Sequence, residues 1–390
     1  MKRITSALSV LALSLALSLP ANAAPKTIQV YIDGSPISFT AGAPYTRQGT
    51  TLVPFRALFE KLGLQVDWNA KTQTVTGKKK DLAIGLTIGS NRATVNGIVK
   101  KLSLSPVTVK GTTYIPLRFI GEASGADVEW DSDSNSIYIY TAASKALDEQ
   151  QIRGLLDQSI EYFNSKDLAK VLTLTSFDSP LRDEEESMKE HAETYLKTSK
   201  IVDFDIINVD SRMGEAVVQT TEESTRTGGF YTPDSRADYI YTLVKEEGAW
   251  KIYSVESQYV EYFISDEALT GTTNIPSADE TSLKQLIDTY FNSLNDKNVD
   301  VLFSTLDPSI ATDEFRDSFI SYFKDNEYKT SLSNFKVIYY TTNQAAVYLE
   351  EKIAYTIDNE TYEDTYKDVF VVDKSQSGKW LISATYSLDE

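Results

Sequence analysis

The sequence predicts a chain of the mixed α+β class, in which a duplicated strand–helix–strand module precedes two α+β domains with curved antiparallel sheets. Two observations predict this class. One phrase with strand, helix and strand periodicity occurs twice near the N-terminus, and a longer order of helices followed by strands occurs twice after it. The expected boundaries are 28–141 for the module, 145–262 and 282–390 for the two domains, and 263–281 for a linker.

The repeated phrase is GTTLVPFRALFEKLGLQVDW at 49–68 and GTTYIPLRFIGEASGADVEW at 111–130, at an offset of 62 residues. Each copy places a proline at the start of an apolar stripe with helical spacing, then a glycine suited to a left-handed helix end, then an alternating strand. Turns are expected at Asp33-Gly34 and Asn96-Gly97, which are favoured hairpin dipeptides. Because one such unit cannot bury its helix stripe alone, we expect the two to share a core. The residues that recur are Pro54, Arg56, Gly63 and Trp68, and Pro116, Arg118, Gly125 and Trp130.

This duplicated pattern resembles the stalk domain family, also called the copper amine oxidase N-terminal domain, over residues 28–141. The resemblance implies a small α+β module of exported Gram-positive proteins, attached to varied partners and separate from the catalytic part of the oxidase. A copper amine oxidase site needs several imidazoles, and this sequence contains one histidine, His191, outside the module. We therefore exclude amine oxidase activity.

Arg56 and Arg118 are unusual because a cation in the first turn of a helix faces an unfavourable dipole. Two roles are open. The arginines could grip a carboxylate or a sugar, or they could bond neighbouring carbonyls or stack on Trp68 and Trp130. The recurrence of the same pairing in both copies favours the structural role, and we treat all eight recurring residues as structural.

The stretch WDSDSN at 130–135 has the spacing of the first three ligands of a calcium loop. Ser136 replaces the glycine that such a loop requires, and Ala142 stands where its bidentate glutamate belongs. The sequence therefore predicts a turn between strands here, with no metal and no cofactor.

The second duplication joins apolar helical stripes at 152–163 and 283–294 to polar turns, KDLAKVL and DKNVDVL, that begin short helices. Strands are then expected at 204–209, 216–222, 239–244 and 250–255, and again at 335–340, 345–351, 369–372 and 380–385. The stretch SDEALTGTTNIPSADET is aperiodic and predicts a linker. This order, closed by a tryptophan strand, resembles the nuclear transport factor 2-like superfamily of cone-shaped domains, which includes enzymes, carriers and association modules.

The first 23 residues predict a secretory signal peptide, with Lys2 and Arg3 before a short apolar run and cleavage between Ala23 and Ala24. The sequence contains no cysteine, which excludes disulfides, thiol chemistry and a lipid-modified cysteine. The formal net charge of −18 disfavours nucleic acid and other anionic polymers as partners. We expect no membrane-integral segment after signal removal, an extracellular location and non-covalent association with the cell wall.

No catalytic signature is present, and His191 lies in a polar helical stretch that predicts a surface histidine without a metal. Strand glutamates could line a pocket, although only one residue of each adjacent pair can point inward and solvated rim positions are favoured. These glutamates are Glu222, Glu223, Glu350 and Glu351. Twenty-three tyrosines suit sugar or peptide contacts, but they also suit ordinary half-buried strands.

The sequence thus favours a secreted, non-catalytic binding or scaffolding protein of the Gram-positive cell envelope, with the module for attachment or spacing. The expected partners are cell-wall glycan or another envelope protein. The alternative is a small-molecule carrier or an enzyme with a pocket in one of the two later domains. A deep cavity with a carboxylate or tyrosine against apolar walls would favour that alternative, whereas filled domains with exposed aromatic rows would favour a binding module.

Overall fold

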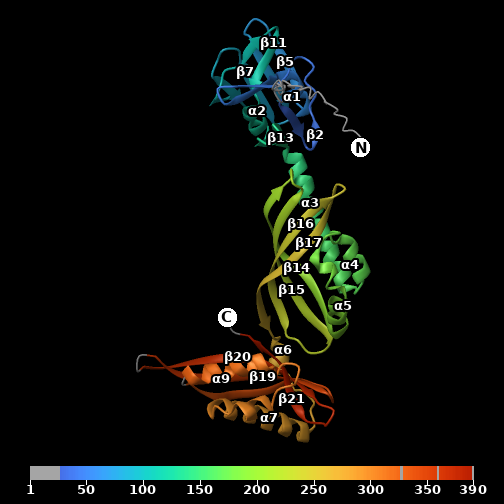
Figure 1. The fold of residues 1–390 in the computed structure, drawn as a ribbon, viewed down its shortest axis with the longest axis vertical. Coiled ribbons are helices and arrows are strands. Elements are labelled where there is room, and N and C mark those ends of the chain that lie inside the picture. Colours follow the sequence, from blue (N-terminus) through green and yellow to red (C-terminus); the bar gives the residue numbers. More distant parts are fainter. Residues whose placement is uncertain (1–26, 326–327, 358–359, 389–390) are drawn as a thin grey trace, which may run out of the picture. The chain divides into compact units, whose positions relative to one another are not determined.

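The computed structural model describes residues 27–388 apart from 326–327 and 358–359. Helices and several sheets occur along the described chain, which confirms the mixed α+β class. The chain separates into two compact units, Met1–Leu147 and Asp148–Glu390. Figure 1 shows the elements that make up each unit.

The described part of the N-terminal unit is built from short strands in three sheets, with orders β12-β13-β1-β2, β10-β11-β4-β3 and β5-β6-β7-β8-β9. Strand β11 pairs with β4, so the strands that open the two repeated phrases are neighbours. Its elements are β1 (Gln29–Ile32), β2 (Ser35–Pro36), β3 (Tyr45–Arg47), β4 (Thr50–Pro54), α1 (Phe55–Lys61), β5 (Gln65–Asn69), β6 (Thr74–Lys79), β7 (Leu82–Thr87), β8 (Arg92–Val95), β9 (Ile98–Lys101), β10 (Val107–Val109), β11 (Thr112–Pro116), α2 (Leu117–Ala123), β12 (Asp127–Asp131) and β13 (Ser136–Tyr140).

Both short helices end as the sequence predicted, at a glycine in the left-handed region. Gly63 has φ +73° and Gly125 has φ +82°. The Gly63 N–H donates to Glu60 O at 3.1 Å, and the Leu64 N–H donates to Phe59 O at 2.9 Å. This pair of bonds is a Schellman motif, which satisfies carbonyls that the helix end would leave unpaired. The predicted hairpin turns are also confirmed, since Asp33-Gly34 and Asn96-Gly97 have positive φ between paired strands.

The two helices contribute to one hydrophobic core. Leu58 and Phe59 of α1 and Leu117 and Ile120 of α2 are all buried in the same cluster. Buried strand residues such as Ile139 complete it. Helices of seven residues are too short to be stable alone in water. Burying a leucine or phenylalanine side chain stabilises the folded state by about 1.5–3 kcal/mol, so this core holds the two helices in place.

The C-terminal unit contains two segments in which helices precede a four-stranded antiparallel sheet. In the first segment, the elements are α3 (Ala142–Asn164), α4 (Leu168–Leu174), the 3₁₀ helix η1 (Pro180–Arg182), α5 (Glu185–Thr194), β14 (Tyr195–Asp210), β15 (Glu215–Gly229), β16 (Asp234–Glu246) and β17 (Ala249–Phe263). In the second, they are α6 (Asp266–Thr270), α7 (Ser277–Asn295), α8 (Val299–Phe303), α9 (Asp313–Asp325), β18 (Tyr328–Tyr340), β19 (Gln344–Ile357), β20 (Glu360–Lys374) and β21 (Trp380–Ser387).

A helix packs on each sheet through the apolar stripe that the sequence predicted. Ile152 and Leu156 of α3 are buried with Val218 and Leu243 in one cluster, and α7 contributes in the same way to a second cluster. Helices α4 and α5 lie beside the first sheet, as Figure 1 shows. Register shifts in strands such as β14 and β17 mark bulges, which bend a strand and increase its twist. The sheet can therefore curve around a cavity.

The structure differs from the sequence-based expectation at three places. The strands are longer than the predicted runs, because hairpin pairing continues beyond the apolar positions. Within the predicted linker 263–281, residues 266–270 form α6, which Ser265 caps through a 3.3 Å bond from the Ala268 N–H, and α7 begins at Ser277. The sequence repeats YFNS at 162–165 and 290–293, but these two stretches are not equivalent in the structure, because the helices end at Asn164 and Asn295.

Candidate functional site

The first segment of the C-terminal unit encloses a cavity of about 420 Å³ between its helices and its sheet. We call it the Glu222 cavity. Its size falls within the range of small-molecule sites, and its lining combines apolar and tyrosine side chains with polar and charged ones. It is lined by Ile160, Phe163, Asn164, Lys166, Leu181, Glu184, Ser187, Met188, His191, Ala192, Tyr195, Lys197, Ser199, Glu222, Ser224, Tyr239, Tyr241 and Val255.

Glu222 lies where an inward-facing row of β15 changes from apolar to polar. Side chains alternate along a strand, so Ala216, Val218, Thr220 and Glu222 share the buried face of the sheet. Glu223 points to the opposite face and pairs with Lys200, with 2.9 Å between Oε2 and Nζ. The prediction that one residue of this pair points inward is therefore confirmed. The favoured rim position is wrong for Glu222, which is only 7% exposed because the sheet curves over it.

Two hydroxyls hold the Glu222 carboxyl in place. The Tyr241 hydroxyl donates to Oε1 at 2.7 Å, and the Thr220 hydroxyl donates to the same oxygen at 3.1 Å. Burial raises the pKa of Glu222 above its ordinary value, although these hydrogen bonds and the nearby charge of Lys197 act in the opposite direction. Burial raises the pKa of Tyr241, and the nearby Glu222 carboxyl raises it further. The arrangement is a buried, hydrogen-bonded acid at the wall of the cavity.

Two basic residues that line the cavity, His191 and Lys197, are partly desolvated although both keep exposed surface. Burial lowers the pKa of Lys197, and it lowers the pKa of His191, to which Lys197 adds a further decrease. His191 stacks obliquely near Tyr195, with 4.6 Å between ring centroids. The side chain is exposed, as predicted for a surface histidine, but it also lines the cavity, which the sequence did not show. Among the residues that the structure describes, no three His, Cys, Asp or Glu side chains are placed to hold a metal ion.

A hydrogen-bonded asparagine joins α3 to the first strand beside the cavity. The Asn164 side-chain amide donates to Ser199 O at 2.8 Å and accepts from the Ser199 N–H at 2.8 Å. Asn295 makes the same two bonds with Thr330 in the second segment, also at 2.8 Å. Sequence reasoning missed this pairing. The available signal was an asparagine at the beginning of each polar turn, followed 35 residues later by the strand residue that it bonds.

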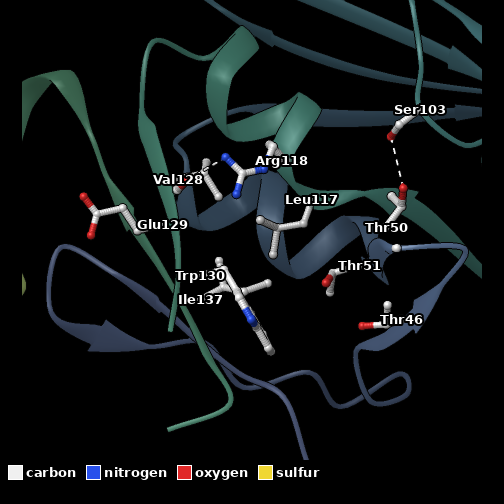
Figure 2. Close-up of a pocket in the computed structure, with 11 residues that line it drawn as sticks. Thr46, Thr50, Thr51, Ser103, Leu117, Arg118, Val128, Glu129, Trp130 and Ile137 are labelled. Atoms are coloured by element: carbon white, nitrogen blue, oxygen red, sulfur yellow. Dashed lines mark hydrogen bonds between the residues drawn. The ribbon is translucent and has the colours of Figure 1, made fainter. Parts of the chain in front are cut away.

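A second hollow of about 470 Å³ lies in the N-terminal unit around two of the recurring residues, Arg118 and Trp130. We call it the Trp130 pocket. Figure 2 shows the Trp130 ring and Arg118 near the centre, Leu117 between them, and threonines across the hollow. Strands β3 and β4 supply one side, and α2, β12 and β13 supply the other. It is lined by Thr46, Gly49, Thr50, Thr51, Ser103, Leu117, Arg118, Val128, Glu129, Trp130 and Ile137.

The two recurring arginines have different contacts. Arg118 Nη1 donates to Val128 O at 2.9 Å and lies 3.7 Å from Glu122 Oε1. Arg56 Nη1 lies 3.9 Å from Glu60 Oε1, and its guanidinium lies over the Phe55 ring at 5.5 Å. A bond to a neighbouring carbonyl, one of the expected structural roles, is thus present for Arg118.

The other recurring residues occupy element ends and strands. Pro54 and Pro116 directly precede α1 and α2, and Gly63 and Gly125 follow the last helical turns. Trp68 lies on β5 and is exposed, like Trp130 on β12. The expected cleavage residues Ala23 and Ala24 lie outside the described residues.

The stretch with calcium-loop spacing is a turn between β12 and β13. Asp131 Oδ1 accepts from the Asp133 N–H at 2.9 Å and from the Ser134 N–H at 3.3 Å. A carboxylate that accepts from backbone two residues ahead is a common way to stabilise a turn. The prediction of a turn is therefore confirmed.

Comparison with known proteins places both parts of the chain. Residues 31–139 match the family model of the copper amine oxidase N-terminal domain, in agreement with the predicted resemblance. Residues 154–263 and 285–389 match the family model described as anti-sigma-I factor RsgI9, C-terminal domain, and together make up more than half of the chain. The chain belongs to this family. The Glu222 cavity therefore lies within the first stretch that matches the RsgI9 C-terminal domain.

A curated relative is a protein from Brevibacillus choshinensis described as a protease inhibitor, 31% identical over 112 residues. The aligned part is 29% of this chain and 34% of the relative, so this chain spans about a third of that relative's length.

Among the described residues, no helix has the length and apolar character needed to cross a bilayer.

Two solved structures are similar to part of the chain. A putative scytalone dehydratase from Novosphingobium aromaticivorans is 16% identical, with TM-score 0.28, over 32% of this chain and 93% of that chain. An NTF-2 like protein of unknown function from Shewanella oneidensis is 16% identical, with TM-score 0.24, over 28% of this chain and 99% of that chain. An NTF-2 like structure is thus among those similar to part of this chain.

The second stretch that matches the RsgI9 C-terminal domain carries a counterpart of Glu222. Ala345, Val347, Leu349 and Glu351 form the corresponding row of β19, and Thr330 Oγ1 donates to Glu351 Oε2 at 3.1 Å. Burial, followed by the nearby charge of Asp368, raises the pKa of Glu351 to about 7. Both stretches therefore place a glutamate with a raised pKa at the polar end of an apolar strand row.

Proposed function

We propose that the chain is an exported binding protein whose ligand is a small, uncharged, mainly apolar molecule held in the Glu222 cavity. The observation that carries this proposal is a buried, hydrogen-bonded carboxyl beside a 420 Å³ space whose walls combine apolar and tyrosine side chains with polar ones. This is the arrangement expected of a carrier or an enzyme, so the structure favours the alternative over a plain scaffold. The domain organisation proposed with it is a duplicated stalk module at 28–141 and two cone domains at 145–262 and 282–390.

The preference for an uncharged ligand follows from the titrating groups. The cavity raises the pKa of the acid Glu222 and lowers the pKa values of the bases Lys197 and His191. A raised pKa for the acid and lowered pKa values for the bases both mean that the cavity disfavours the charged forms of these groups. A ligand with an apolar body and one hydrogen-bonding end would leave the walls dry and pair with Glu222 or with hydroxyls such as that of Tyr239.

The proposal is tested with N-phenyl-1-naphthylamine, a neutral apolar probe whose fluorescence rises when it leaves water. We expect the mature chain to bind this probe and Ala192→Phe, which fills the cavity from α5, to weaken binding by about tenfold, or 1.4 kcal/mol. The matched control is Glu190→Phe on the same helix, since Glu190 is exposed and outside the lining. Equal binding by the two variants would contradict the proposed site.

The second candidate is a proton-transfer enzyme in the same cavity. It is favoured by the raised pKa of Glu222 and the direct bond from Tyr241, because perturbed acids gather at catalytic sites. Glu222→Gln separates the two functions once a ligand is known. A carrier should keep its affinity within a few fold, whereas an enzyme that uses Glu222 as its acid or base should lose about 10²–10⁴-fold in turnover.

We also propose export by the segment 1–23 and non-covalent attachment to the cell wall through the stalk module. The support is the sequence pattern at the N-terminus and the match of 31–139 to a domain whose sequence resemblance implies exported Gram-positive proteins. Expression of the full chain in a Gram-positive host should release a protein that begins at Ala24. N-terminal sequencing that returned Met1 or Lys2 from the secreted fraction would reject the proposed cleavage. The matched family model is described as an anti-sigma factor domain, and the curated relative is described as a protease inhibitor. Signalling and inhibition are therefore two candidate uses of ligand binding.

A further inference from the structure

We propose that the Trp130 pocket binds an uncharged oligosaccharide. This inference deepens the attachment role proposed for the stalk module and names the chemistry of its partner. It does not depend on the Glu222 cavity, which lies in the other unit.

The first observation is the exposed ring on the pocket wall. Trp130 is 45% exposed although it lies on a strand that pairs with β13, and Figure 2 shows its ring inside the hollow. A large apolar ring left in contact with water at a concave site is a typical anchor for a ligand. The flat ring suits the C–H face of a pyranose, which is apolar although its rim carries hydroxyls.

The second observation is the hydrogen-bonding wall opposite the ring. Thr46, Thr50, Thr51 and Ser103 bring hydroxyls to the pocket, and each hydroxyl can both donate and accept. Thr50 Oγ1 donates to Ser103 Oγ at 3.3 Å, a long bond between two residues that are far apart in sequence. Sugar hydroxyls also donate and accept, so they match such a wall better than a purely anionic ligand does.

Arg118 adds fixed donors between these two walls. Its bond from Nη1 to Val128 O holds the guanidinium in place, and a guanidinium carries five N–H donors in a rigid plane. Its side chain is well exposed, so further N–H groups face the solvent-filled hollow. The arginine is thus positioned to donate to ring or hydroxyl oxygens.

The charge of the pocket favours an uncharged sugar. Glu122 lies beside Arg118, with 3.7 Å between Oε1 and Nη1, and partly offsets its charge, whereas the Glu129 side chain points away from the hollow in Figure 2. An acidic sugar would be repelled by a chain with net charge −18. A basic ligand would meet the arginine. A neutral ligand avoids both penalties.

The same positions in the other copy of the repeated phrase provide a comparison within one molecule. At the offset of 62 residues, Phe55 corresponds to Leu117, and Ala41 corresponds to Ser103. Arg56 lies over the Phe55 ring, where Arg118 instead bonds a backbone carbonyl. The counterpart of the pocket therefore contains a larger side chain and lacks one hydroxyl, although Trp68 is exposed like Trp130. Trp68 is a matched control for Trp130.

The test is titration of the full mature chain with N-acetylglucosamine tetramer and with cellotetraose, followed by tryptophan fluorescence and calorimetry. We expect binding of at least one of these neutral sugars, about tenfold weaker binding by Trp130→Ala, and a change below about twofold for Trp68→Ala. Thr51→Val, which keeps the side-chain shape, should weaken binding without removing the ring. It provides a second variant if Trp130→Ala alters the fold.

Three outcomes would overturn the inference. These are no binding of either sugar at millimolar concentration, equal losses in the two tryptophan variants, or tighter binding of galacturonate tetramer than of the neutral sugars. Failure of wall attachment with intact sugar binding would instead reject the attachment role alone. The two proposals can therefore fail separately.

Discussion

At the scale of single residues, the adjacent glutamates Glu222 and Glu223 differ in burial: Glu222 is buried, and Glu223 is partly exposed. Strand alternation predicted that they face opposite ways, but which one is buried depends on the register against β16 and on the Tyr241 hydroxyl. Neither the strand register nor the contact with Tyr241 can be read from the sequence. The available signal was the row of alternate residues Ala216, Val218, Thr220 and Glu222, which resembles Ala345, Val347, Leu349 and Glu351.

Replacing Glu351 should change how the stability of the C-terminal unit depends on pH. The folded-state pKa, about 7, lies above the ordinary 4.5, so the folded state binds this proton more tightly than the unfolded chain. The free energy of unfolding therefore falls as pH rises from about 4.5 to about 7. Because Glu351 is only partly buried, we expect Glu351→Gln to recover about 1–2 kcal/mol at pH 8 and little at pH 4. Urea unfolding at several pH values measures this.

Asp368 provides the internal check on that prediction. Its charge adds to the raised pKa of Glu351, so Asp368→Asn should move the loss of stability to lower pH. A pH dependence that is the same in the native chain and in Glu351→Gln would contradict the assignment to this side chain.

Two helical glycines should respond in opposite ways to alanine. A Cβ added at Gly121 of α2 would lie 2.3 Å from Val128 Cγ2 in the core, so Gly121→Ala should destabilise the N-terminal unit by about 1–3 kcal/mol. At Gly154 of α3, no atom lies within 4 Å of the added Cβ. Gly154→Ala should therefore stabilise the C-terminal unit by about 0.5–1 kcal/mol through helix propensity. Thermal unfolding followed by circular dichroism measures both, and a destabilising Gly154→Ala would count against this account.

At the scale of elements, α3 and α7 are fixed to their sheets by two equivalent polar clusters. In each cluster an aspartate of the helix accepts hydrogen bonds from a lysine and a tryptophan of the sheet. Asp148 accepts from Lys245 Nζ at 2.6 Å and from Trp250 Nε1 at 2.9 Å. Asp279 accepts from Lys374 Nζ at 3.0 Å and from Trp380 Nε1 at 3.2 Å. The terminal tryptophan strands were predicted from the sequence, but their aspartate partners were not, because the partners lie about a hundred residues away.

Removing these aspartates should affect the two segments unequally. The Asp148 side chain is 4% exposed and that of Asp279 is 21% exposed. Asp148→Ala leaves the buried Trp250 indole N–H without its acceptor and removes the partner of the partly exposed Lys245, which should cost about 1–3 kcal/mol. Asp279→Ala should destabilise less, because the Asp279 carboxylate is more exposed and water screens its charge interactions more strongly. Urea unfolding of the full chain with each variant measures the order, and a larger loss for Asp279→Ala would reverse the argument.

The elements themselves were largely predictable, and so were the ends of the two short helices, but at least one end of each long strand was not. Proline, glycine and apolar spacing located α1 and α2 to within a residue, since local chemistry decides their ends. The long strands β14 to β21 extend past every predicted apolar run, because cross-strand pairing and not local propensity decides where they stop. The cavity depends on this extension, since Lys197 and Ser224 lie beyond the predicted strands.

At the scale of the whole molecule, charge should decide how salt affects wall attachment. The chain has a formal net charge of −18, and a wall that contains anionic polymers repels it. Raising the salt concentration from about 10 mM to about 150 mM shortens the screening length from about 30 Å to about 8 Å. If the contacts are to uncharged sugar, the fraction of the mature chain that sediments with purified cell wall should therefore rise over this range.

The tryptophan variants sharpen that measurement. Trp130→Ala should sediment less than the native chain at every salt concentration but with the same rising trend, because the repulsion is unchanged while the sugar contact is lost. Trp68→Ala should coincide with the native chain. A sedimented fraction that falls as salt increases would mean that ion pairs hold the protein to the wall. Attachment would then lie in a basic surface such as Lys78, Lys79 and Lys80, and not in the Trp130 pocket.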